Sequence, residues 1–249
     1  MSLSVANFYK FIGLSGLTEL RDRWQAAAER YLLVGTVTIA PEGINAALAG
    51  SAVALGQFEA WVRADPDFAD VAFKMSQADS PPFRRLEVKI KRWTIRFAEN
   101  GDPGLEAISA GPRISAAELA QLIATQSAAI VLIDTRNDYE TEAGTFSGAV
   151  RLPIKNFTEF PQAFCQRFGA ERDKAFVFYC TGGIRCEKAV PWAQAQGFAN
   201  VRQLDGGILT FLAEQGGDGG FEGDCFVFDE RRRVDGTLYA AGNAVTLLA

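Results

Sequence analysis

The chain has 249 residues, is 48% hydrophobic and carries a formal net charge of −5, which allows one or two well-packed domains and argues against a protein that coats nucleic acid nonspecifically. It contains no histidine, which excludes a Ser-His-Asp triad, a Cys-His pair and an iron site built from two histidines and a carboxylate. Its four cysteines lack the spacing of a disulfide framework or a zinc site, and no segment is typical of a membrane span or a signal peptide, so we expect a cytoplasmic protein without a bound metal.

The first part of the chain alternates strand-like and helix-like segments. Four segments have the β-branched, aromatic or alternating apolar residues that predict strands: 5–11, 35–39, 46–49 and 86–91. Two segments have apolar residues at helical spacing: 18–33, with Thr18 as its cap, and 52–64, with Ser51 as its cap. The order strand-helix-strand-strand-helix-strand is that of a ferredoxin-like α+β domain, to which we assign residues 1–105.

The second and third of these strands are joined by Pro41-Glu42-Gly43-Ile44-Asn45. A tight turn between strands is the simplest interpretation of such a sequence. Glu42 and Asn45 are its polar members, and the residues alone assign them no role beyond the turn.

A basic cluster lies in and around the last predicted strand of this domain. Its members are Arg84, Arg85, Lys89, Lys91, Arg92 and Arg96. The interleaved aromatic residues Phe83 and Trp93 are able to stack on bases. One interpretation is a solvated strand face, and the other is RNA binding by the five cations from Arg84 to Arg92. Because side chains alternate along a strand, we expect Lys89 and Lys91 on one face, with Val88 and Ile90 packed on the other.

Glycine and proline at 100–104 and 111–112 indicate a linker to a second domain. Ser115 predicts the cap of a helix over 116–124, with Glu118 in the capping-box position. Strand-like segments then alternate with helical ones: 129–133, 144–150, 176–179 and 201–204. This order predicts an α/β domain with a parallel sheet and helices on both faces, which we assign to residues 113–215. Residues 216–249 are then a C-terminal extension.

The strand over 176–179 leads into a loop that carries a cysteine at the carboxyl end of the sheet. The loop residues are Cys180, Thr181, Gly182, Gly183, Ile184, Arg185 and Cys186, and a helix follows. Backbone N–H groups, the helix N-terminus and the charge of Arg185 all lower a thiol pKa, so we predict that Cys180 is a nucleophile. The alternative is a buried structural cysteine. Cys186 is either a resolving thiol or a packed helix residue.

Asp134 and Arg136 follow the strand over 129–133, at the same edge of the sheet as Cys180. One interpretation is that they support the Cys180 loop electrostatically. The other, which we favour, is an ion pair within the domain that fixes the next turn.

The Cys180 loop resembles the active-site loop of rhodanese domains, which carry a persulfide on this cysteine. The sequence from Ile114 to about Gln215 is similar to such a domain, with Thr145 at a position that is histidine in many members. Three strings together resemble one subfamily, the rhodanese-domain tRNA uridine hydroxylases: E-G-I-N at 42–45, C-T-G-G-I-R-C-E-K-A at 180–189 and F-V-F-D-E-R at 226–231. Many members also have a segment with CxxC pairs, which this sequence lacks.

The resemblance implies an enzyme that hydroxylates the wobble uridine of tRNA to 5-hydroxyuridine. It implies Cys180 as the catalytic residue, the tRNA anticodon arm as partner, and molecular oxygen and an unidentified reductant as co-substrates. It also implies a substrate-facing role for Glu42 and Asn45. No bound cofactor is identifiable from the sequence, which does not indicate an oligomeric state either. The alternative enzyme is a persulfide sulfurtransferase, and a third hypothesis, a catalytically silent binding module, is disfavoured by the intact Cys180.

Overall fold

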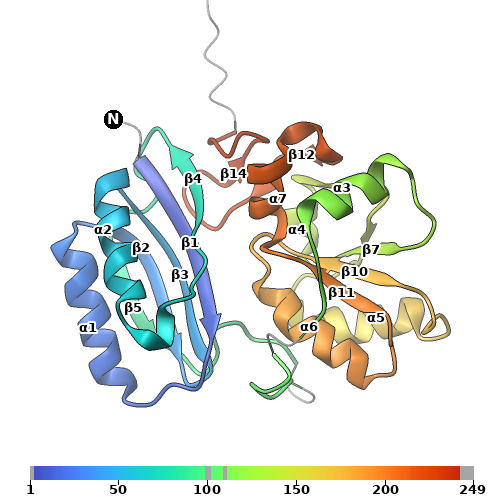
Figure 1. Ribbon diagram of the computed structural model, residues 1–249, viewed down its shortest axis with the longest axis horizontal. Helices are drawn as coiled ribbons and strands as arrows, with labels where there is room; N and C mark the ends of the chain where they lie inside the picture. Colours follow the sequence, from blue (N-terminus) through green and yellow to red (C-terminus); the bar gives the residue numbers. More distant parts are fainter. Residues whose placement is uncertain (1–2, 99–101, 109–110, 242–249) are drawn as a thin grey trace, which may run out of the picture.

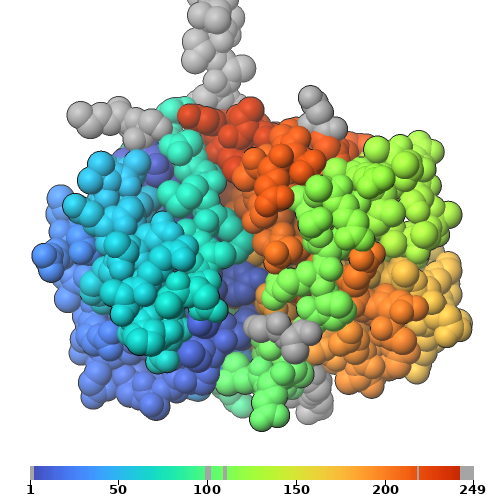
Figure 2. Space-filling view, viewed as in Figure 1, coloured from blue at the N-terminus to red at the C-terminus, as the bar shows by residue number. Residues whose placement is uncertain are grey.

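The computed structural model describes residues 3–98, 102–108 and 111–241. Two domains lie side by side, each built on a five-stranded sheet, and the last described residues lie at the seam between them (Figure 1). In the space-filling view the N-terminal domain, blue to teal, and the second domain, green to orange, meet along this seam (Figure 2). The candidate functional residues lie on both sides of the seam.

The N-terminal domain is a mixed sheet covered on one face by two helices. The strands lie in the order β4-β1-β3-β2-β5, and β5 runs parallel to β2 whereas the other pairs are antiparallel. The bounds are Leu3–Phe11 for β1, Val34–Ala40 for β2, Gly43–Gly50 for β3, Lys74–Ala78 for β4 and Leu86–Ile90 for β5. Helices α1 (Leu17–Arg30) and α2 (Ala52–Arg63) pack Trp24 and Phe58 against one face. The other face points toward the second domain (Figure 1).

The ferredoxin-like architecture is confirmed, with a correction to its last strand. The fourth strand of the unit is β4, which was not predicted because Lys-Met-Ser-Gln-Ala has no clean apolar alternation. The strand expected at 86–91 is β5, an additional edge strand. Val88 packs on the helix side, and Lys89 lies on the opposite face, as expected. The expectation that Ile90 is packed is wrong, because it ends the strand and is 42% exposed.

The predicted helix boundaries agree with α2 to within one residue, since it ends at Arg63 and not at Ala64, and are wrong for α1. Ser51 caps α2 as expected, and its side chain accepts a hydrogen bond from the Ala54 N–H at 3.1 Å. In α1 the N-cap position is occupied by Gly16, so Thr18 lies inside the helix. The helix ends at Arg30, short of the expected Leu33, because Leu32 has a left-handed φ of 55° that interrupts it.

The second domain is a parallel sheet with helices on both faces, as predicted. The order is β6-β11-β10-β7-β9, and every pair is parallel. The bounds are Arg113–Ile114 for β6, Val131–Asp134 for β7, Val150–Arg151 for β9, Phe176–Tyr179 for β10 and Val201–Leu204 for β11. One face packs α3 (Ala116–Ala124) and α7 (Gly207–Gln215), and the other packs α5 (Phe160–Phe168) and α6 (Ile184–Ala195).

Helix α3 is capped by Ser115, whose side chain accepts a hydrogen bond from the Glu118 N–H at 3.2 Å. The expected capping box is not completed. The carboxylate of Glu118 pairs instead with Arg202, at 2.8 Å. None of the helices in the described part of the chain has the length and apolar character that a membrane span requires.

The residues after α7 connect the two domains. β8 (Gly144–Phe146) pairs with β12 (Phe221–Gly223), and β13 (Cys225–Phe226) pairs with β14 (Arg233–Val234). Arg231 Nη1 donates to Ser76 Oγ at 2.9 Å and to the carbonyl oxygen of Gln77 at 3.0 Å, both on β4. The C-terminal extension therefore holds the N-terminal sheet against the second domain.

Candidate active site

Cys180 lies at the carboxyl end of β10, in the turn that leads into α6. β10 is buried along its whole length, and Gly183 has a φ of 94° that lets the helix begin at Ile184. The Gly183 N–H donates to Cys180 Sγ at 3.1 Å. Cys180 itself is only 2% exposed. The predicted strand-loop-helix placement of this cysteine is confirmed, but the helix begins at Ile184 instead of Cys186, so Ile184 and Arg185 lie in its first turn and not in the loop.

Burial by itself raises the pKa of the Cys180 thiol, but the surrounding donors outweigh it and lower the pKa to about 6. The largest lowering contribution is a hydrogen bond from Cys186, followed by the charge of Arg185 and by backbone N–H groups of Arg185 and Gly183. Burial, together with the neighbouring Cys180, raises the pKa of Cys186 well above that of an ordinary thiol. Cys186 is thus a buried, protonated donor to the Cys180 thiolate, which favours packing over a resolving role.

The guanidinium of Arg185 is held by a buried ion pair. Its Nη2 lies 2.8 Å from Oε2 of Glu140, in the short helix α4 (Asp138–Thr141), and both side chains are almost fully buried. Arg185 Nη1 is buried without a hydrogen-bond partner among the described residues. A charged donor is therefore available beside Cys180 for an anionic sulfur or oxygen.

The N-terminus of α7 supports the Cys180 loop. The N–H groups of Ile208 and Leu209 donate to the carbonyl oxygens of Cys180 and Thr181, each at 3.0 Å. Gly207 has a φ of 70°, and a Cβ atom at this position would lie 2.5 Å from the Cys180 carbonyl oxygen. Only glycine fits here, so the loop depends on the Asp-Gly-Gly string that follows β11.

Asp134 and Arg136 form a completely buried ion pair within their own turn. Arg136 Nη2 lies 2.7 Å from Asp134 Oδ2 and donates to the carbonyl oxygen of Gly144 at 2.6 Å. Thr145 completes the group by donating to Asp134 at 3.2 Å. These contacts favour the interpretation as an ion pair that fixes the turn after β7.

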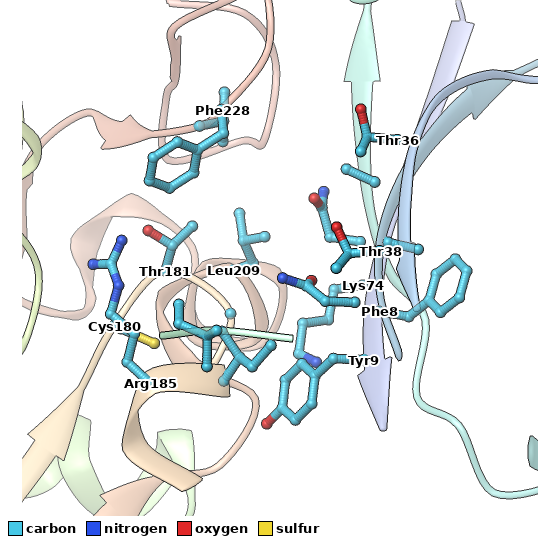
Figure 3. Close-up of a pocket in the computed structure, with 18 of the residues that line it drawn as sticks. Phe8, Tyr9, Thr36, Thr38, Lys74, Cys180, Thr181, Arg185, Leu209 and Phe228 are labelled. Atoms are coloured by element: carbon cyan, nitrogen blue, oxygen red, sulfur yellow. The ribbon is translucent and has the colours of Figure 1, made fainter. Parts of the chain in front are cut away.

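A cavity of about 510 Å³ separates the Cys180 loop from the N-terminal sheet. The second domain contributes Cys180, Thr181, Gly182, Ile184, Arg185 and Leu209. The sheet contributes Asn7, Tyr9, Thr36, Thr38, Asn45 and Lys74. Of these, Tyr9 and Lys74 extend toward the Cys180 side in Figure 3. Tyr139 and Phe228 line it as well. Asn45 is therefore brought to Cys180 from the other domain.

Glu42, by contrast, is not among the residues that line the cavity. Its Oε1 accepts hydrogen bonds from the N–H and the hydroxyl of Thr94, both at 2.8 Å. Its Oε2 lies 2.8 Å from the ammonium of Lys188 on α6. Glu42 thus supports the site by joining the two domains, and the substrate-facing role that the resemblance implies for it has no counterpart in these contacts.

A second polar bridge joins the domains through the residue before Lys188. Glu187 accepts a hydrogen bond from the Tyr9 hydroxyl at 2.8 Å. Arg113 also donates to Glu187, at 2.8 and 3.1 Å. The helix that begins at the Cys180 loop therefore contacts β1 directly, which fixes the distance across the cavity.

Two family models match the chain: the UPF0176 acylphosphatase-like domain over residues 3–93 and the rhodanese-like domain over residues 115–214. A tRNA uridine(34) hydroxylase of Bordetella petrii is 46% identical over 246 residues, which cover 97% of this chain and 96% of that protein. The enzyme of that name from Xanthomonas euvesicatoria pv. vesicatoria is 44% identical over 234 residues, 92% of this chain and 93% of that protein. The chain belongs to the tRNA uridine(34) hydroxylase family.

The three strings that suggested the hydroxylase family meet at the seam. E-G-I-N supplies Glu42 to the domain contact and Asn45 to the cavity. C-T-G-G-I-R-C-E-K-A supplies Cys180 and, on the following helix, Lys188. F-V-F-D-E-R supplies Phe228 to the cavity. Segments far apart in the hydroxylase sequence therefore build one site.

The basic cluster lies mainly outside the cavity, and several of its charges are paired. Arg85 and Lys89 both form ion pairs with Glu87. Arg84 pairs with Glu230 at 3.2 Å. The guanidinium of Arg92 lies over the ring of Trp93 at 4.4 Å, while Lys91 is exposed just beyond β5. The cluster is an exposed basic edge of the hydroxylase.

Lys74, Tyr139 and Phe228 are among the cavity residues that were not predicted from the sequence. Lys74 lies on the unpredicted strand β4, and Tyr139 and Phe228 lie in segments without regular apolar spacing. Tyr139 and Phe228 are 43% and 60% exposed. The only available signal for Phe228 was its place in the F-V-F-D-E-R string.

Proposed function

We propose that this protein hydroxylates carbon 5 of uridine 34 in the anticodon arm of tRNA, with Cys180 as the catalytic residue. One observation carries the proposal: Cys180 opens into a cavity of about 510 Å³ that the other domain closes on the opposite side. Sites for small ligands have volumes of about 300–1,000 Å³. A base must leave its stack before an enclosed side chain reaches it, and a cavity of this size suits one flipped nucleotide.

Exposed aromatic rings beside the cavity support an unpaired RNA loop as the substrate. Phe226 lies 5.3 Å from Tyr139 and 5.2 Å from Phe228, measured between ring centroids. The guanidinium of Arg185 lies 5.7 Å from the centroid of Phe228. Exposed aromatic faces stack on bases that have left a helix. We assign this surface to the nucleotides that flank uridine 34.

The basic edge supplies the phosphate contacts. Lys89 lies on the same sheet face as Thr38, which lines the cavity. An RNA strand that leaves the cavity over β2 therefore meets Lys89 and then Lys91 and Arg92. Contacts of this kind depend on charge and not on sequence, so they position the anticodon arm without reading it.

Dioxygen and a two-electron reductant are the co-substrates. One oxygen atom ends in the hydroxyl group that replaces the hydrogen on carbon 5, and the other leaves as water, with two electrons and two protons from the reductant balancing the reaction. The Cys180 thiolate has two routes open to it. It adds to carbon 6, makes carbon 5 electron-rich, and leaves carbon 6 again when the oxygenated carbon 5 loses its proton. Alternatively, it carries the oxygen on a persulfide or an oxidised sulfur. The pKa of about 6 keeps Cys180 ionised at neutral pH, as both routes require.

The alternative function is that of a persulfide sulfurtransferase, for which the Cys180 loop by itself would be sufficient. The arrangement of the two domains favours the hydroxylase. A sulfur carrier needs only the second domain, whereas here β1, β2, β3 and β4 supply one side of the cavity. We place the hydroxylase in the cytoplasm, together with its tRNA substrate.

Nucleoside mass spectrometry of tRNA from cells that lack this protein tests the proposal. We expect 5-hydroxyuridine at position 34 to fall and to return when the wild-type chain is supplied. Cys180→Ser restores nothing. Cys165→Ser, which alters a thiol outside the cavity, restores the modification fully. Unchanged 5-hydroxyuridine in the deletion strain would contradict the proposed function.

A further inference from the structure

The helix-free face of the N-terminal sheet presents two unused donors to the cavity. Asn7 on β1 pairs with Lys74 on β4, so both side chains lie on this face. The Asn7 amide nitrogen is buried without a hydrogen-bond partner among the described residues. In Figure 3, Lys74 and Tyr9 extend toward the side of the cavity that holds Cys180 and Arg185.

Lys74 is a half-buried cation without a carboxylate partner among the residues that the structure describes. Its ammonium lies 4.7 Å from the ring centroid of Tyr9, and the Tyr9 hydroxyl is fixed by Glu187 at 2.8 Å. Burial lowers the pKa of Lys74, and the negative charge on Cys180 opposes that effect. An ammonium in such a place is stabilised when a ligand brings an acceptor to it.

The pattern of hydrogen-bond donors and acceptors on the pyrimidine edge decides which base suits Asn7 and Lys74. Uracil has a carbonyl oxygen at position 4 and an N–H at position 3, whereas cytosine has an amino group and a bare ring nitrogen there. The amide of Asn7 serves either base, because rotation exchanges its oxygen and nitrogen. The ammonium of Lys74 only donates, so it accommodates the carbonyl and is mismatched with the amino group.

We propose that Lys74 selects uracil over cytosine by donating a hydrogen bond to the 4-carbonyl oxygen of the flipped base, while the Asn7 amide turns so that its oxygen accepts from the N3–H. This inference rests on the proposed function, since it names how the same cavity reads its substrate. The same contact stabilises negative charge on that oxygen when a thiolate adds to carbon 6. Lys74 therefore contributes to discrimination in binding and to the rate of hydroxylation.

Binding of anticodon stem-loops with U34 or C34 tests the inference, with Lys74→Met, Lys74→Arg and the wild type compared. We expect the wild type to bind U34 more tightly than C34. Lys74→Met lowers the U34-to-C34 affinity ratio by about tenfold or more, the loss expected for one hydrogen bond to a charged group. Lys74→Arg retains most of the ratio, because the donor remains. Lys174→Met, the same change at an exposed residue outside the cavity, leaves it unchanged.

Near-ultraviolet circular dichroism checks that Lys74→Met is folded. An unchanged U34-to-C34 affinity ratio in this folded variant would overturn the inference. Equal affinity of the wild type for the two stem-loops would overturn it as well. Formation of 5-hydroxyuridine by the wild type is measured separately on the U34 stem-loop. Hydroxylation with an unchanged ratio in Lys74→Met refutes only the role of Lys74. A preference for U34 without any hydroxylation refutes only the proposed function.

Discussion

The ammonium of Lys188 lies 2.8 Å from Oε2 of Glu42, and the two residues belong to different domains, 146 positions apart. Lys188 is completely buried and has Asp102 as its second partner at 3.1 Å. Removing one partner from a buried pair is costly, because the other charge stays out of water. This ion pair lies outside the cavity and keeps its two walls, one from each domain, in position.

Glu42→Ala should lower the free energy of unfolding by about 3 kcal/mol and reduce hydroxylation, since the N-terminal sheet loses its contact with α6. Urea denaturation measures the first effect. The matched control is Glu59→Ala, which removes an exposed pair with Arg63 and should cost less than about 0.5 kcal/mol. Equal costs for the two variants would mean that the Glu42 pair does not hold the domains.

The Cys180 thiol should react with iodoacetamide with a midpoint near its pKa of about 6. An unfolded thiol has a pKa of about 8.5, so Cys180 ionisation stabilises the fold above that pH and the benefit is lost as the pH falls through 6. Alkylation rates against pH, with Cys180→Ser as the blank, show the midpoint. A midpoint at or above the unfolded value would mean that burial prevails over the donors.

Cys186→Ala should raise the alkylation midpoint of Cys180 and lower activity only in part. The hydrogen bond from Cys186 lowers the Cys180 pKa more than any other neighbouring group does, whereas Cys186 itself is buried and out of reach of reagents. Hydroxylation assays and the same alkylation series measure both effects. If Cys186→Ala were as inactive as Cys180→Ser while the midpoint stayed near 6, Cys186 would have to act as a resolving thiol.

Gly207→Ala should abolish activity, because its Cβ atom would lie 2.5 Å from the carbonyl oxygen of Cys180. Gly148→Ala is the control. Gly148 has a similar φ of 73° but open space around a Cβ atom. Alanine at this position should therefore cost about 1 kcal/mol of backbone strain without displacing the Cys180 loop. Comparable activity in the two variants would show that the loop tolerates the collision.

Replacing Lys89 and Lys91 by alanine should weaken tRNA binding and leave persulfide loading of Cys180 unchanged. Each lost phosphate contact should reduce the log–log salt slope by about 0.7. Because Lys89 also pairs with Glu87, the loss of Lys89 should reduce the salt slope by about 0.7 or less. Affinity across a salt series measures the slope, with Lys155 and Lys174 replaced in the control. An identical slope would remove the RNA contact from this edge.

The elements that local chemistry determines were predictable from the sequence. Ser51 and Ser115 cap their helices as expected, and Cys180 lies in the expected strand-loop-helix turn. β4 was missed because its residues have no period of two. Strand pairing, not propensity, makes it a strand.

The second-domain side of the site was predictable from the sequence, whereas on the other side only Asn45 was indicated, by the E-G-I-N string. Cys180 and Arg185 lie in one continuous string, so their proximity follows from the chain. Lys74 and Tyr9 reach the cavity through the packing of one domain on the other, and no local pattern encodes that. The contact between Glu187 and Tyr9 spans 178 residues. Packing of this kind is read from the structure alone.

Hydroxylation of uridine 34 inside the two-domain cavity should depend on Cys180 and on dioxygen. Purified protein is incubated with unmodified tRNA, a reductant and isotopically labelled dioxygen, and the nucleosides are analysed by mass spectrometry. We predict labelled 5-hydroxyuridine at position 34 with the wild type and none with Cys180→Ser. Equal product from Cys180→Ser would contradict a catalytic role of Cys180, and a product without label would contradict dioxygen as the oxygen source.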